Sequence, residues 1–123
     1  PYTRTTSFVI ACSDETTALT TGTKVTFRLP FAFTITEVRA SLTTAGTGAN
    51  LVTLDFEQNN TSILTTKITI NATQLTSTTA STPPVILTSA LTDDASIDCD
   101  VDQIDSGGVS AGLKMYLIGY KTL

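Results

Sequence analysis

Aspartates are the residues whose type and spacing in this chain could most readily do chemistry. Six of them lie close together near the C-terminal end: Asp93, Asp94, Asp98, Asp100, Asp102 and Asp105. Carboxylate oxygens at this density can hold calcium, so we consider a site at Asp98, Asp100 and Asp102. These three alternate along a segment that reads as a strand, where they would project in one row about 7 Å apart. Because a straight row does not curl around an ion, we favour a solvated strand face paired with Lys114 on a neighbouring strand, and therefore predict no metal.

Catalysis is disfavoured by which residues are present and how they are spaced. Two carboxylate pairs invite a glycosidase interpretation, Asp55 with Glu57 and Asp93 with Asp94. Each pair consists of near neighbours on one segment, whereas glycoside hydrolysis needs two carboxylates that face each other across a sugar. There is no tryptophan to stack on a sugar ring and no histidine to serve as the base of a serine or cysteine nucleophile. We expect neither an enzyme nor a cofactor.

Two cysteines, Cys12 and Cys99, share the strand faces that carry the apolar residues. We interpret them as small buried hydrophobic residues. A disulfide needs Cα atoms within about 7 Å of each other, and the sequence leaves that question open. A zinc site is disfavoured because the chain has no histidine and no closely spaced cysteine pair.

The composition predicts one β-rich domain. Of 123 residues, 41% are hydrophobic, 15% are charged and 27 are threonine, a β-branched residue that suits a pleated, half-buried surface. The net charge of −4 gives no electrostatic footprint for phosphate groups, so nucleic acid and anionic membranes are not expected partners. No apolar run approaches the ~20 residues of a transmembrane helix. No signal-peptide pattern precedes the domain, which favours synthesis in the cytoplasm of a host cell.

Period-two alternation of apolar residues marks the elements that must position these groups. It predicts about eight strands, near residues 8–12, 24–29, 37–42, 52–57, 68–70, 85–87, 97–102 and 113–118, with a ninth at 63–64. Asn59 and Asn60 predict a hairpin turn, since asparagine tolerates positive φ. One short helical turn is expected at residues 71–75, capped by Asn71. Without crossover helices, the pairing should be antiparallel. We therefore predict an antiparallel β-sandwich over residues 8–123, after an N-terminal arm of residues 1–7.

Three segments carry a resemblance to a known group of proteins: KVTFRLPFAFTITEVRASLTTAGTG at 24–48, DFEQNNTSIL at 55–64 and KITINA at 67–72. Together they resemble small structural proteins and fibre-tip domains of tailed bacteriophages, over nearly the whole chain. The resemblance implies a jelly-roll-like sandwich, exposure on the virion and a trimer. It brings no catalytic residue. The sequence departs from the group at Asn59-Asn60, where related sequences tend to have Asn-Gly, and at the two cysteines.

Two apolar features predict contacts between subunits. The segment around Phe31 and Phe33 is apolar at consecutive positions, so it is either a strand end and corner that plugs the sandwich or a subunit contact, since aromatic side chains often anchor interfaces. Tyr116, Ile118 and Tyr120 lie opposite the apolar face of the last strand, where a monomer would carry polar groups. We expect a threefold contact at this strand.

The leading prediction is a virion structural protein, a trimeric capsid decoration or head-fibre protein that contacts the major capsid protein or a fibre. It would act by burying surface, without chemistry. The alternative is a receptor-binding module at a fibre tip, which grips a host-surface glycan through loops such as residues 43–50.

Overall fold

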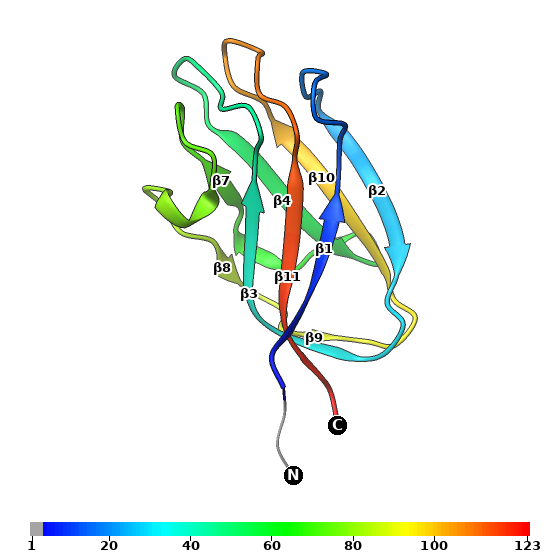
Figure 1. The fold of residues 1–123 in the computed structure, drawn as a ribbon. Coiled ribbons are helices and arrows are strands. Elements are labelled where there is room, and N and C mark those ends of the chain that lie inside the picture. The colour runs from blue at the N-terminus through cyan, green and yellow to red at the C-terminus, as the bar shows by residue number, and fades with distance from the viewer. Residues whose placement is uncertain (1–3) are drawn as a thin grey trace.

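Two antiparallel sheets pack against each other in the computed structural model, which describes residues 4–123 (Figure 1). Sheet A has the order β1 (Thr6–Ala11), β11 (Lys114–Lys121), β3 (Phe33–Ser41) and β9 (Ala90–Leu91). Sheet B has the order β2 (Gly22–Arg28), β10 (Ser96–Gln103), β4 (Val52–Gln58) and β5 (Thr61–Ser62), and β7 (Ile68–Ile70) also pairs with β4. A third, two-stranded sheet joins β6 (Leu64–Thr66) to β8 (Val85–Ile86).

The predicted all-β sandwich with antiparallel pairing is confirmed. Alternation places apolar side chains of both sheets in one core, where Phe33, Phe56, Ile97 and Leu117 are fully buried. Burial of each such side chain stabilises the fold by about 1.5–3 kcal/mol. The first strand begins earlier than the alternation suggested, because Thr6 and Ser7 pair with β11. Of the predicted arm, residues 1–3 lie outside the described residues.

The Asn59-Asn60 hairpin is confirmed. Both residues adopt positive φ, 51° and 69°, and they connect Gln58 to Thr61 at the paired ends of β4 and β5. This is the backbone of a two-residue turn whose twist matches that of the flanking strands. The Asn59 side chain also accepts a hydrogen bond from the backbone N–H of Ser96 at 3.1 Å. The turn is thereby tied to the start of β10.

The helical turn predicted at 71–75 is wrong in position. A single 3₁₀ turn, η1, spans Ser77–Thr79, and its cap is Thr76, whose side chain accepts a hydrogen bond from the N–H of Thr78. Asn71 accepts one bond from the N–H of Gln74, which makes a turn that does not continue. Across residues 4–123, no helix is long and apolar enough to cross a membrane.

Candidate functional site

The outer face of β11 carries the apolar residues that the alternation predicted there. Tyr116, Ile118 and Tyr120 alternate with fully buried neighbours and are themselves half-buried. Tyr116 Oη and Ser41 Oγ share a hydrogen bond of 2.9 Å, so the ring lies flat enough to reach the adjacent strand. On the other side, Tyr116 lies opposite Val9 of β1, which is 60% exposed. We call Val9, Tyr116, Ile118 and Tyr120 the outer strip.

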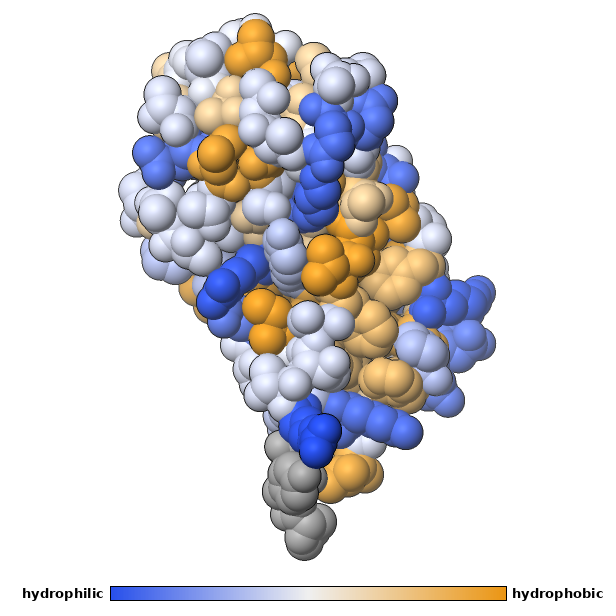
Figure 2. Space-filling model, in the orientation of Figure 1, coloured by the Kyte–Doolittle hydropathy of each residue, from blue (hydrophilic) through white to orange (hydrophobic). Residues whose placement is uncertain are grey.

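A second apolar surface lies at the side of the sandwich where β1 and β2 are the edge strands. The inward-facing side chains there are covered on one side only and remain partly exposed: Phe8, Ile10, Val25, Phe27 and Phe31. We call this group the seam. Figure 2 shows hydrophobic side chains gathered along this side of the molecule, between β1 and β2. The seam is therefore an exposed extension of the core.

The two phenylalanines predicted as contact residues have different environments. Phe33 is fully buried, and its ring centroid lies 4.9 Å from that of Phe8 in an edge-to-face arrangement. Its side chain is therefore part of the core and offers no surface. Phe31 is half-buried, with Lys121 Nζ 5.3 Å from its ring centroid. Of the two, only Phe31 can contact a partner in this fold.

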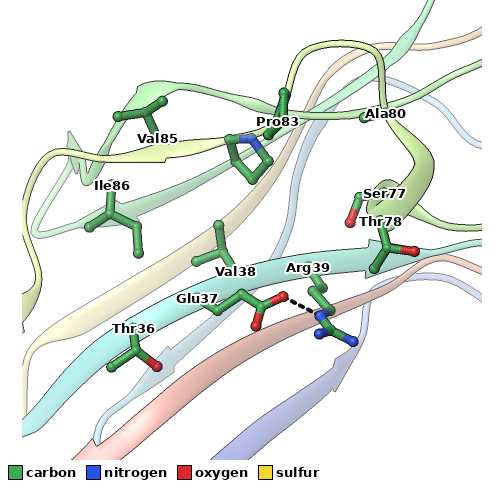
Figure 3. Close-up of a pocket in the computed structure, with 11 residues that line it drawn as sticks. Thr36, Glu37, Val38, Arg39, Ser77, Thr78, Ala80, Pro83, Val85 and Ile86 are labelled. Carbon is green, nitrogen blue, oxygen red and sulfur yellow. Dashed lines mark hydrogen bonds and ion pairs between the residues drawn. The ribbon is translucent and has the colours of Figure 1, made fainter.

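A groove of about 550 Å³ runs along β3 on the opposite side of the sandwich (Figure 3). One wall is β3 from Thr36 to Arg39, and the other is the segment from Ser77 to Ile86, which includes η1 and β8. Figure 3 shows Val38 and Ile86 pointing into this space, while the Glu37 carboxylate forms an ion pair with Arg39. Its floor is thus apolar and its rim is charged, and none of the described residues that line it is aromatic.

The outer face of sheet B is acidic. β10 carries Asp98, Asp100 and Asp102, and β4 carries Asp55 and Glu57 beside them. The strand register places Asp100 opposite Asp55 and Asp98 opposite Glu57. Oxygens of Asp55, Glu57 and Asp100 lie within 4.8 Å of one another. Like charges directly opposite each other destabilise a strand pair, so this face needs compensating contacts.

Hydroxyl groups and one lysine supply that compensation. Thr23 Oγ1 donates to Asp100 at 2.6 Å, and Ser62 Oγ donates to Asp55 at 2.7 Å. Lys67 Nζ lies 2.5 Å from Asp102 and 3.9 Å from Asp55. The predicted pairing with Lys114 is wrong, because Lys114 belongs to sheet A. A strand that is next in sequence does not have to be next in the sheet.

The pKa values of the charged groups on this face are shifted because the groups lie close together and are partly buried. Burial raises the pKa of Asp55, against the lowering effects of Ser62 and Lys67. A hydrogen bond between the carboxyl groups of Glu57 and Asp100, together with burial, raises the pKa of Glu57, because this bond needs a proton on one of the two groups. The hydrogen bond from Lys67 to Asp102 raises the pKa of the lysine ammonium. Protonation of Glu57 would therefore relieve repulsion on this face.

As a calcium site, the acidic face offers a small ligand set. The converging carboxylates are Asp55, Glu57 and Asp100, whereas Asp98 accepts from Thr26 and Asp102 pairs with Lys67. Of the predicted row, only Asp100 belongs to the cluster. Calcium takes six to eight oxygen ligands, so three carboxylates on two flat strands leave its shell incomplete. Nothing in the sequence marked Asp55 and Glu57 as partners of Asp100, since their contact depends on strand register.

The loop at residues 43–50, predicted as a glycan-binding candidate, is hydrogen-bonded to the buried carboxylate of Asp105. This carboxylate is 2% exposed and accepts hydrogen bonds from the N–H groups of Thr47, Val109 and Ser110 and from Ser110 Oγ. Asn50 N–H also donates to Ser106 Oγ at 2.9 Å. The loop is therefore pre-organised, but its contacts are directed inward.

Cys12 and Cys99 are both buried and free, as small hydrophobic residues would be. Contact with Cys12, together with burial, raises the pKa of the Cys99 thiol. Both side chains contribute packing in the core cluster. The thiol of Cys12 also donates to the Ile10 carbonyl at 3.4 Å.

Comparison with known proteins adds no assignment: no family model, curated protein or solved structure matches this chain. A function must therefore be inferred from the outer strip, the seam, the groove and the acidic face.

Proposed function

We propose that this chain is a virion structural protein of a tailed bacteriophage, a trimeric capsid decoration or head-fibre protein that acts by burying surface. The observation that carries the assembly part is the outer strip. Val9 is 60% exposed, and the half-buried Tyr116 and Ile118 lie beside it on the face of sheet A that faces solvent, where threonine and charged residues would suffice. Contiguous, partly exposed apolar groups of this kind mark interaction sites.

The assignment to a bacteriophage particle is supported by the sequence resemblance, which runs over nearly the whole chain. The chemistry of the described surfaces is compatible with a purely structural role. The acidic cluster holds its carboxylates by hydrogen bonds on a flat sheet face, and no cleft separates Asp55 from Asp100. Such a protein would stabilise a particle through contacts alone.

Mass spectrometry and cryo-electron microscopy of the phage particles that encode this chain would test the proposal. We expect the chain among the particle proteins, in density with threefold symmetry on the capsid or its fibres. Particles that lack the chain would overturn the virion assignment.

A glycan-binding fibre-tip module remains the second candidate, and the groove beside β3 is the observation in its favour. Its volume of about 550 Å³ lies within the range of ligand pockets, and its rim offers Thr36, Glu37 and Thr78 for hydrogen bonding. None of the described lining residues supplies an aromatic ring for stacking, which counts against tight sugar binding. Binding on a glycan array, abolished by Glu37→Gln, would favour this candidate over a purely structural role.

A further inference from the structure

The free edge of β1 is an unused hydrogen-bonding surface. Within residues 4–123, β1 pairs only with β11. The N–H of Cys12, just past the strand, donates to the Leu113 carbonyl at 2.9 Å, so even-numbered residues of β1 turn their backbone groups toward the sheet. By alternation, the N–H and C=O groups of Ser7, Val9 and Ala11 point away from it. They can pair with another strand.

This edge lacks the features that normally keep strand edges apart. The sequence of β1, Thr-Ser-Phe-Val-Ile-Ala, contains no charge, proline or glycine, and its pairing with β11 has no register shift. In contrast, the edge strand of sheet B, β2, carries Lys24 and Arg28, and its pairing with β10 shifts at Cys99/Asp100. The remaining edge strands, β5 to β9, have two or three residues each. Charges, bulges and shortness are the usual protections, and β1 has none of them.

Apolar surface lies directly beside the same edge. Phe8 and Ile10 point from β1 into the seam, where Phe27 and Phe31 are also partly exposed. The ring centroids of Phe8 and Phe31 lie 5.8 Å apart, so the exposed rings form one cluster. Figure 2 shows this hydrophobic surface as continuous along the side of the molecule. A strand added to β1 would cover it.

We propose that a second copy of this chain docks on this edge, with the two β1 strands antiparallel and Val9 opposite Val9. Ser7 of each copy then pairs with Ala11 of the other, so all three outward-facing residues gain partners. Charge complementarity favours this occupant and this direction. Arg4 lies before one end of β1 and Asp14 after the other, so an antiparallel pair brings them together twice. The contact is isologous and closes on itself, and sheet A continues from one copy into the next.

This contact is independent of the proposed virion role and of the outer strip. It uses backbone groups at the edge of β1, whereas the outer strip uses side chains on the face of sheet A. The two contacts together would join six chains, the edge contact alone would join two, and the outer strip alone would join three. The number of chains therefore tells the two proposals apart.

Light scattering and sedimentation of the purified chain test the edge contact, with Ser7→Pro as the blocking variant, because Ser7 lies outside the outer strip. Proline removes only an N–H that points away from the sheet, which an edge strand tolerates. We expect wild-type protein to contain two or six chains, and Ser7→Pro to contain half that number. Ser7→Thr is the matched control: it keeps the N–H and the hydroxyl group, so it should keep the edge pairing. A wild-type protein of one or three chains, or an unchanged Ser7→Pro assembly, would overturn the proposal.

Charge variants and hydrogen exchange provide readouts that do not depend on proline. Arg4→Glu should weaken pairing about tenfold or more at low salt. Asp14→Asn should weaken it less, while it keeps an acceptor for the N–H groups of Thr16 and Thr17. Asp93→Asn, in the exposed turn before β10, should leave it unchanged. The amides of Ser7, Val9 and Ala11 should become protected from exchange as concentration rises, and fast exchange of these amides at every concentration would contradict the contact.

Discussion

Asp105 shows how one buried carboxylate organises two loops. Burial by itself would raise its pKa, but hydrogen bonds from Ser110, Val109 and Thr47 outweigh this effect and lower the pKa to about 2. The neighbouring Gly46 is packed so closely that an added Cβ would lie 2.6 Å from Asp105 Cβ. The charged form of Asp105 is therefore part of the folded structure, and its loss should be felt in both loops.

Asp105→Asn should destabilise the chain by about 2 kcal/mol at neutral pH, because an amide nitrogen would face backbone N–H donors. The folded pKa lies below the ordinary value of 3.8, so this stability is present above pH 3.8 and is lost as the pH falls toward 2. Denaturant unfolding from pH 7 to pH 2 measures the difference. The difference in the free energy of unfolding between wild type and Asp105→Asn should shrink across that window. Asp93→Asn, an exposed control, should change the free energy of unfolding little at any pH. A constant difference would contradict this account.

Glu57→Gln should change stability in the opposite direction from Asp105→Asn, with a gain at neutral pH. The folded pKa of Glu57 is raised above its ordinary value, so wild-type stability is fully present below that ordinary value and declines as the pH rises through the raised pKa. Glutamine can donate to the Asp100 carboxylate without repulsion, and should stabilise the chain at pH 7 by up to about 1 kcal/mol. Thermal melts at pH 7 and pH 4.5 would show a gain only at the higher pH. Equal gains at both values would exclude relief of charge as the cause.

The sequence did not distinguish Asp105, which is buried and hydrogen-bonded, from the exposed aspartates near the C-terminal end. Asp105 and Asp98 look alike in the chain, yet one is held by donors from residues 47 and 109–110 and the other accepts from Thr26 on β2. Those donors come together only after the sheets pair. The acidic cluster was missed for the same reason, since Asp55 meets Asp100 through strand register and not through spacing.

The Asn59-Asn60 hairpin is the element whose structure was predicted most completely. Both its place and its positive φ values follow from the two asparagines between alternating segments. Asn60→Gly should stabilise the chain by about 0.5–1 kcal/mol, because glycine adopts a φ of 69° without strain and the Asn60 side chain is exposed to solvent. Asn59→Gly is the matched comparison and should gain less, because it loses the bond to Ser96. Chemical denaturation of both variants would check this order, and the reverse order would refute it.

The close approach of β11 and β3 near Gly119 was not predictable from alternation. A Cβ at Gly119 would lie 1.9 Å from the Thr34 carbonyl oxygen, where the register shifts between Ile118 and Gly119. Gly119→Ala should therefore destabilise the chain by about 1–3 kcal/mol, because backbone atoms on both strands must move apart. Ala40→Gly, on the adjacent strand, is a control for lost packing alone. A melting temperature within about 1–2 °C of wild type for Gly119→Ala would show that the strands can separate at this point.

Strands were predictable where one face meets the core, and local structure was not predictable where tertiary contacts decide it. Phe27, Leu54 and Ile97 alternate with polar residues and belong to strands as predicted. The 3₁₀ turn formed at Ser77 and not at Asn71, because Ser77 Oγ accepts the N–H of Ala40 on β3 and anchors the turn there. That anchor comes from a strand more than thirty residues away, which no local signal records.

At the scale of the whole molecule, the two sheets present different surfaces to their surroundings. Sheet A presents the exposed Val9 beside the half-buried Tyr116 and Ile118, whereas sheet B presents a face of carboxylates that includes Asp98 and Glu57. The acidic face resists association with a like face, because the repulsion would add to the crowding that already raises the pKa of Glu57. Contacts between copies are therefore favoured on sheet A and its edge.

Ile118→Thr tests the predicted threefold contact on that sheet. Threonine keeps the β-branched shape and the strand propensity of Ile118, so the monomer fold should be retained, while the apolar contact is lost. Light scattering should show assemblies that are no longer multiples of three, and the dissociation constant should rise about tenfold or more, since a buried isoleucine at an interface contributes about 1.5–3 kcal/mol. Thr36→Ser, outside the outer strip, is the matched control. Circular dichroism would confirm that both variants fold, and an unchanged trimer of folded Ile118→Thr would place the contact elsewhere on the molecule.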